Sequence, residues 1–185
     1  AGGDLYLNIG EARGAFRYEP AYASDALSEI DEGYFIEQLD GDENGGTIKI
    51  TAFGRTRIYE NATSITGFAG TGDDFIVMDD SVEVPVEIRG GAGDDVIVYG
   101  GSGFAELYGD GGDDYLDVGS DGSVLIRVIG GSGADFIRHR GTAPARLEGG
   151  SGQDRIIGGP GNDQIYGGAD DDEIDSGGEI GRAHV

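Results

Sequence analysis

A nine-residue repeat dominates this sequence and restricts what the chain can fold into. From Ala69 onward, the pattern Gly-Gly-x-Gly-x-Asp-x-apolar-x occurs seven times. Four of these copies are intact, and each of the other three departs from the pattern at one position. A short fixed period of this kind is typical of solenoids, in which each repeat packs only against its neighbours.

Two positions of the repeat keep their character in every copy. The sixth residue is always aspartate: Asp74, Asp95, Asp114, Asp135, Asp154, Asp163 and Asp172. The eighth residue is always aliphatic: Ile76, Ile97, Leu116, Ile137, Ile156, Ile165 and Ile174. Because side chains alternate across a strand, x-aliphatic-x predicts a short strand with one inward side chain. Because glycine adopts positive φ easily, Gly-Gly-x-Gly predicts a tight loop rather than a strand.

Degenerate nine-residue units lie between most of the intact ones. They keep an aliphatic eighth residue but have an apolar sixth residue, and their eighth residues are Ile88, Leu107, Val128 and Leu147. One intact and one degenerate unit make a coil of 19 or 21 residues with two strands and two turns. The degenerate strands should be longer, with two inward-facing series: Val84, Val86 and Ile88, then Val124, Ile126 and Val128. The sequence therefore predicts an all-β fold, a parallel β-roll or β-helix solenoid of about six coils.

The net charge of the chain indicates that a compact fold requires bound cations. The chain has 36 acidic and 12 basic residues and a net charge of −24, so a compact form repels itself unless cations neutralise it. Nucleic acid and anionic membranes are poor partners for such a chain, and no apolar run is long enough for membrane insertion. Cysteine is absent from the sequence, which excludes disulfides and thiolate metal sites. A disordered acidic linker is the alternative, but the fixed aliphatic position would serve no purpose there.

We divide the chain into residues 1–66, 67–178 and 179–185. The first part lacks the repeat but should be an irregular β-rich portion or cap, with four strands: Asp4–Ile9, Tyr34–Leu39, Thr47–Phe53 and Thr56–Tyr59. Residues Ala21 to Ile30 should form a loop or one helical turn. The segment Asp40–Gly45 resembles the start of an EF-hand loop, but Thr51 stands where the twelfth-position Glu is needed, so a hairpin turn is favoured.

The last seven residues, Glu179–Val185, abandon the repeat. They match the translation of a common sequencing-library adapter, so we expect a non-native tail and a chain that is part of a larger polypeptide.

The nonapeptide resembles the RTX family, the calcium-binding repeats of toxins, proteases, lipases and adhesins exported by bacterial type I secretion. The strand-rich start is similar to segments of giant extracellular proteins of this type. The resemblance implies Ca²⁺ ions held between adjacent turns by the sixth-position aspartates, in one row at Asp74, Asp95, Asp114, Asp135, Asp154 and Asp172. Asp163 belongs to the one intact turn on the other side, where few or no ions are expected. The family's loop carbonyls correspond to Gly70, Gly72, Gly91, Gly93, Gly112, Gly131, Gly133, Gly150, Gly152, Gly159, Gly161 and Gly168. The fifth-position acids, Asp73, Asp94, Asp113 and Asp171, should be exposed rather than ligating.

The resemblance also implies a secreted or cell-surface protein. Neither a zinc-protease His-Glu-x-x-His nor a Gly-x-Ser-x-Gly motif is present, and His139 should be a surface residue, so we expect no enzyme in this chain. A calcium-dependent structural or adhesive extender of a surface protein is the favoured interpretation, its surface or matrix ligand being unspecified. The alternative is the export and folding module of a hydrolase or toxin whose catalytic domain lies outside this chain.

Overall fold

The computed structural model describes residues 3–8, 33–42, 45–52, 54–177 and 182–184. Every regular element in these residues is a β-strand, as the repeat predicts. No helix in this described part is long and apolar enough to span a membrane. The segment Ala21 to Ile30, for which a loop or helical turn was predicted, lies outside the described residues.

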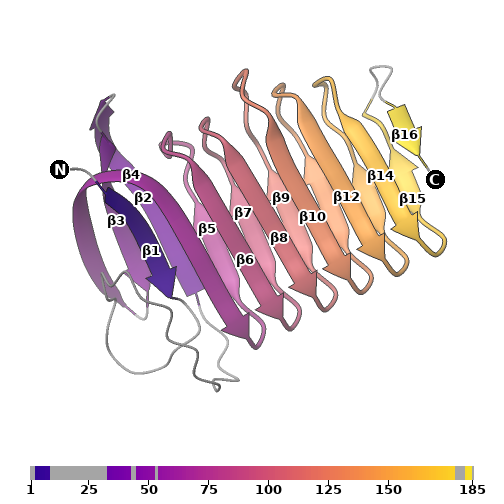
Figure 1. Ribbon diagram of the computed structural model, residues 1–185, viewed down its shortest axis with the longest axis horizontal. Coiled ribbons are helices and arrows are strands. Elements are labelled where there is room, and N and C mark those ends of the chain that lie inside the picture. Colours follow the sequence, from indigo (N-terminus) through magenta and orange to yellow (C-terminus); the bar gives the residue numbers. More distant parts are fainter. Residues whose placement is uncertain (1–2, 9–32, 43–44, 53, 178–181, 185) are drawn as a thin grey trace.

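Two parallel stacks of strands form the body of the solenoid (Figure 1). The first stack contains the short strands β5 (Phe75–Met78), β7 (Val96–Tyr99), β9 (Tyr115–Val118), β11 (Phe136–His139), β13 (Arg155–Ile157) and β15 (Glu173–Asp175). The second contains β4 (Arg55–Thr71), β6 (Val86–Ala92), β8 (Ala105–Gly111), β10 (Ile126–Ser132), β12 (Ala145–Ser151), β14 (Gln164–Ala169) and β16 (Arg182–His184). Each coil contributes one strand to each stack, which confirms the predicted two-sided solenoid of about six coils.

The two stacks join at the N-terminal end through an antiparallel hairpin. Strand β2 (Gly33–Asp42) pairs with β3 (Gly45–Ala52), and Asp42 stands opposite Gly45, which agrees with the predicted hairpin turn. On their other sides, β2 pairs in parallel with β5 and β3 pairs antiparallel with β4. Strand β1 (Gly3–Asn8) adds to β4 in parallel. The four predicted strands of the first part are therefore confirmed.

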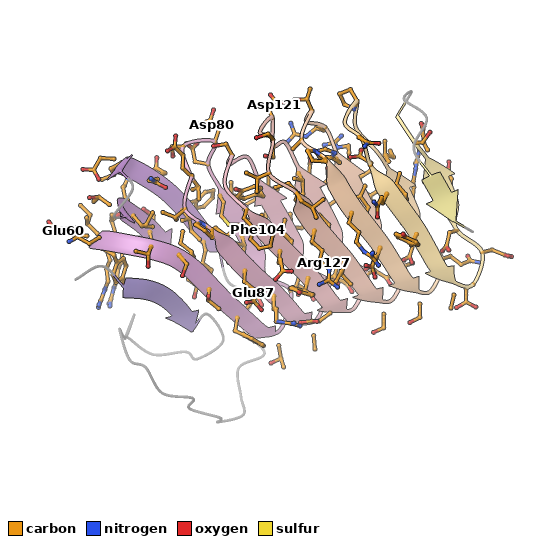
Figure 2. The ribbon with its side chains drawn as sticks, turned by 45° about the horizontal axis from the view of Figure 1, so that its top comes forward. Glu60, Asp80, Glu87, Phe104, Asp121 and Arg127 are labelled. Carbon is orange, nitrogen blue, oxygen red and sulfur yellow. The ribbon has the colours of Figure 1, made fainter. Side chains whose placement is uncertain are left out.

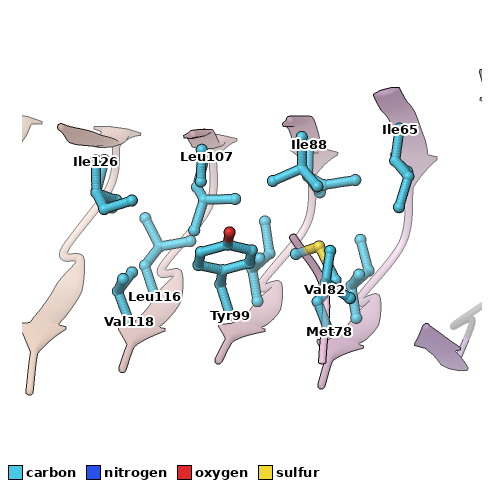
Figure 3. Packing of buried hydrophobic residues seen from close by; sticks show 14 of the residues in the cluster. Ile65, Met78, Val82, Ile88, Tyr99, Leu107, Leu116, Val118 and Ile126 are labelled. Carbon is cyan, nitrogen blue, oxygen red and sulfur yellow. The ribbon is translucent and has the colours of Figure 1, made fainter. Parts of the chain in front are cut away.

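The interior is a double ladder of aliphatic side chains. Ile76, Ile97, Leu116, Ile137 and Ile156 from the short strands are fully buried, and Ile174 is partly buried. They face a second ladder from the longer strands, formed by Ile88, Leu107, Val128, Leu147 and Ile165. Figure 3 shows side chains of the two stacks pointing toward one another across this interior. The eighth position of the repeat thus forms the core, as predicted.

The length of each coil follows from hydrogen bonds between equivalent residues in neighbouring coils. Successive coils contain 21, 19, 21, 19 and 18 residues. The last coil is shorter than the predicted 19 or 21 residues because both of its turns, at Gly149 and Gly158, are unexpanded nonapeptides. The residues added in the longer coils lie in turns of the edge opposite the aspartate row.

Two local expectations were wrong. Residues in the first three positions of most repeats, such as Gly90, Gly91 and Ala92, end a strand rather than forming a loop, because pairing with the next coil continues through them. Val124 does not face inward with Ile126 and Val128; it is 39% exposed, because it lies in a turn and β10 begins only at Ile126. The predicted greater length of the strands on this side is confirmed.

Candidate metal sites

The turns that follow β4, β6, β8, β10, β12 and β14 line up along one edge of the solenoid, which we call the aspartate edge (lower edge in Figure 1). The ten glycines predicted as carbonyl donors on this edge all have positive φ, between 110° and 131°. Asp110 and Asp170 replace glycine in two of the turns and have φ of 75° and 80°, a region that aspartate tolerates better than most residues. The turns therefore share one backbone shape despite these two substitutions.

The sixth-position aspartates form a continuous hydrogen-bonded ladder along this edge. The backbone N–H of each one donates to the Oδ1 atom of the equivalent aspartate in the next coil, over 2.8 to 3.0 Å. The ladder runs through Asp74, Asp95, Asp114, Asp135, Asp154 and Asp172. The structure thus brings together all six aspartates of the predicted row.

The second carboxylate oxygen of these residues is buried and lacks a hydrogen-bond donor. This holds for the Oδ2 atoms of Asp95, Asp114, Asp135, Asp154 and Asp172. A buried carboxylate oxygen that is not compensated by a donor or a cation carries a large free-energy penalty. Repetition of the same uncompensated atom in successive coils indicates a row of positions that favours cations.

Sequence analysis missed the role of the first glycine of each repeat. An ideal Cβ atom at Gly109 would lie 2.1 Å from Oδ2 of Asp114 and 2.6 Å from the carbonyl oxygen of Gly130 in the next coil. Equivalent clearances, of 2.1 to 2.2 Å from the aspartate Oδ2, occur at Gly90, Gly130, Gly149 and Gly167. None of these five glycines has positive φ, so the absent side chain matters for space and not for backbone freedom. Only Ala69, in the first turn, brings a methyl group to this position.

Burial also changes the acidity of the row. Desolvation is the largest cause and raises the pKa of Asp95 and Asp135 to about 6 and that of Asp114 to about 7. Neighbouring carboxylates raise the pKa further, whereas the hydrogen bond from the preceding coil lowers it. The pKa of Asp154 is raised for the same reasons. Without a cation, Asp95, Asp114, Asp135 and Asp154 therefore resist ionisation more than an ordinary aspartate does.

The donor set fits calcium. Among the described residues, no three His, Cys, Asp or Glu side chains gather into a metal-binding cluster, so the side chains alone do not form a complete metal site. Calcium accepts about six to eight oxygen ligands and takes carboxylates and carbonyls together. The Oδ2 atoms of Asp95, Asp114, Asp135 and Asp154 each lie around the same point of the turn as the carbonyl oxygen of the first glycine in the next coil.

The fifth-position aspartates lie at the surface rather than in the buried row. Asp73, Asp94, Asp113 and Asp171 are exposed, as predicted. The Oδ1 atoms of the first three accept hydrogen bonds of 2.7 to 2.8 Å from the backbone N–H of the following coil. These carboxylates therefore satisfy backbone donors between coils at the surface.

Asp163 lies on the opposite edge, whose turns include Asp80, Phe104 and Asp121 (Figure 2). It is buried, and both of its carboxylate oxygens accept hydrogen bonds from protein groups. Gly159 and Gly161, predicted as carbonyl donors, do not have positive φ. The predicted exposure of His139 is wrong: it is 1% exposed, because alternation along β11 turns Ile137 and His139 inward together.

Comparison with known proteins supports this assignment of the repeat. The family model of the RTX calcium-binding nonapeptide repeat matches residues 87–103 and 148–180 in four copies. No curated protein and no solved structure matches the chain. RTX repeats of this kind bind calcium. The chain therefore carries hemolysin-type, calcium-binding RTX nonapeptide repeats, stacked as a β-solenoid.

Proposed function

We propose that the aspartate edge holds a row of Ca²⁺ ions between adjacent turns. Asp74, Asp95, Asp114, Asp135, Asp154 and Asp172 would supply carboxylate oxygens. The predicted positive-φ glycines would supply carbonyl oxygens, together with the first glycines Gly109, Gly130, Gly149 and Gly167, whose carbonyl oxygens lie near the aspartate Oδ2 atoms. The observation that carries this proposal is the buried Oδ2 atom that recurs in successive coils without a hydrogen-bond donor. Six turns would hold about five ions if each ion lies between two turns.

Calcium would then decide whether the chain folds. The core contributes few aliphatic side chains per coil, whereas ordering the backbone costs about 1–2 kcal/mol per residue. With millimolar calcium, one site with a dissociation constant of about 0.1 mM stabilises the fold by about 1.4 kcal/mol. About five such sites contribute about 7 kcal/mol, which is comparable to the whole stability of an ordinary domain.

We infer that the module works outside the cell as a calcium-dependent extender of a secreted or surface protein. RTX proteins are exported by type I secretion, and a chain that stays unfolded until it meets extracellular calcium suits that route. The elongated stack in Figure 1 favours a spacer, since each added coil lengthens the rod by about 4.8 Å. A partner bound at its surface would make the extender adhesive.

Calorimetric calcium titration of two charge-matched variants tests the proposal. Asp114→Asn keeps an oxygen for the N–H of Asp95 but replaces the second carboxylate oxygen by an amide. Asp121→Asn removes one charge on the opposite edge, where Asp121 Oδ1 similarly accepts the N–H of Thr142 over 3.0 Å. We expect Asp114→Asn to weaken calcium binding about tenfold or more and Asp121→Asn to change it less than about twofold. Equal effects of the two variants would contradict the proposed row.

A further inference from the structure

The edge opposite the aspartate row contains one intact repeat, Gly158–Tyr166, whose turn has a different backbone shape. On the aspartate edge, the second and fourth residues of an intact turn have positive φ, for example 127° at Gly150 and 120° at Gly152. The corresponding Gly159 and Gly161 do not. Since φ sets the direction of the neighbouring peptide groups, the carbonyls of this turn do not repeat the arrangement of the other edge.

The carboxylate of Asp163 is also satisfied differently. Its Oδ1 atom accepts the backbone N–H of Ala145 over 2.9 Å. Its Oδ2 atom accepts the N–H of Gly159 over 2.9 Å and lies 3.2 Å from Nδ1 of His139. In the aspartate row, by contrast, Oδ1 accepts a backbone N–H and Oδ2 has no donor. The Asp163 turn therefore lacks the uncompensated oxygen that favours a cation in the row.

His139 fills the space beside this carboxylate. The side chains of both residues are almost completely buried. A Cβ atom at Gly159 would lie 3.0 Å from Nδ1 of His139, so the ring rests against the backbone of the turn. Because the imidazole lies inside the solenoid, it occupies volume that an ion between two turns would need.

The neighbouring coil offers no second carboxylate at the matching position. On the aspartate edge, the sixth residue of every stacked turn is aspartate, so each ion can lie between two of them. On the opposite edge, the matching residues in the four preceding units are apolar: Val86, Ala105, Ile126 and Ala145. A calcium ion beside Asp163 would meet a single carboxylate that already accepts two backbone N–H groups and lies 3.2 Å from Nδ1 of His139.

We propose that His139 takes the place of calcium at the Gly158–Asp163 turn, so that an intact RTX motif closes here without metal. The chain then carries calcium along the aspartate edge alone. This inference rests on the proposed function of that edge, and it assigns His139 a positioning role that holds Asp163 and the turn in place.

A crystal structure of the unmodified chain grown with millimolar calcium, with anomalous data that locate the ions, tests this directly. The expected result is a calcium ion beside Asp154 and none coordinated by Asp163. Calcium coordinated by Asp163, with His139 displaced, would overturn the inference while leaving the proposed function intact. Calcium at neither edge would contradict the proposed function, and the contrast between the edges would fall with it.

Ion counts by native mass spectrometry give a second test with a matched pair of variants. Asp154→Asn and Asp163→Asn make the same change at the same repeat position on the two edges. We expect Asp154→Asn to lose at least one bound ion and Asp163→Asn to keep the number found in the unmodified chain. If Asp163→Asn binds fewer ions than the unmodified chain, whatever the result for Asp154→Asn, the inference is overturned. The crystallographic test needs no variant, so a folding failure of either variant leaves it unaffected.

Discussion

The backbone N–H of Asp95 donates to Oδ1 of Asp114, one coil further along, over 2.8 Å, while the buried Oδ2 of Asp114 has no donor. One carboxylate thus links two coils through one oxygen and presents the other to the inside of its own turn. A cation bound at that second oxygen would be held by the same groups that stack the coils. In the proposed row, calcium binding and coil stacking would therefore be coupled through single side chains.

Acid should stabilise the calcium-free chain. Burial raises the pKa of Asp95 and Asp135 to about 6 and that of Asp114 to about 7 in the fold, against about 3.9 for an unfolded aspartate. Between these values the folded chain binds more protons than the unfolded chain, so the free energy of unfolding falls as the pH rises from about 4 to about 7. Circular dichroism in chelator should show more β-structure at about pH 5 than at about pH 8.

The effect of pH on calcium affinity has the opposite sign. Calcium binds the ionised carboxylate, so its affinity should rise as the pH rises over the same interval. Asp114→Asn serves as the control for the calcium-free measurement, because it removes the carboxyl group with the higher pKa and should flatten the dependence. An increase in the β-structure of the chelated chain from about pH 5 to about pH 8 would contradict the raised pKa values.

The first glycine of each repeat should be intolerant of a side chain. Gly109→Ala would bring a methyl group within 2.1 Å of Oδ2 of Asp114 and force the carboxylate out of the turn. We expect a loss of about 1–3 kcal/mol in the calcium-loaded state and weaker calcium binding. Thermal unfolding and calorimetry measure the two effects.

Gly111→Ala is the matched control for Gly109→Ala. It lies in the same coil, where its Cβ would lie 3.1 Å from Oγ of Ser132 and 3.7 Å from the carbonyl oxygen of Gly91, and equivalent positions already hold Ala92 and Ser132. The reciprocal change Ala69→Gly gives the first turn the missing clearance and should tighten calcium binding there. Similar losses from Gly109→Ala and Gly111→Ala would refute the steric argument.

Adjacent residues of β8 should differ sharply in their effect on stability. Leu107 is fully buried between Ile88 and Val128, so Leu107→Ala should cost about 2–5 kcal/mol. Glu106 lies on the outer face 3.5 Å from Arg127, and its truncation to Ala should change the free energy of unfolding by less than about 1 kcal/mol. Denaturant unfolding with calcium present measures both variants. Comparable losses would mean that the aliphatic ladder does not carry the core.

The repeat made much of this fold predictable. The eighth position identified the inward side chains and the sixth identified the aspartate row, because both recur at the same point of every coil. The first glycine escaped notice because its glycine character looked sufficiently explained by backbone freedom. The structure shows that a side chain at Gly109 would clash with Oδ2 of Asp114, so glycine is needed there because it has no side chain.

Structural features that do not recur with the nine-residue repeat could not be predicted in this way. Strands β2 and β3 and the turn between them were expected, but the parallel pairing of β2 with β5, which joins the hairpin to the first stack, is a long-range contact that no local pattern specifies. The contact of His139 with Asp163 joins residues 24 positions apart in different coils. Tyr99 is likewise buried, and its hydroxyl donates to the carbonyl of Gly103 inside a turn that lacks the motif. Such contacts arise from individual side chains and carry no repeat signal.

The most direct test of the account is a calcium titration at neutral pH, starting from chelated chain and followed by far-UV circular dichroism, with magnesium as the control. Because calcium tolerates irregular sets of carbonyl and carboxylate oxygens better than magnesium does, only calcium should act. We expect a disordered chain in chelator that gains β-structure near millimolar calcium and does not respond to magnesium. A chain that is fully β-structured in chelator and unchanged by calcium would contradict it and leave the aliphatic ladder as the source of stability.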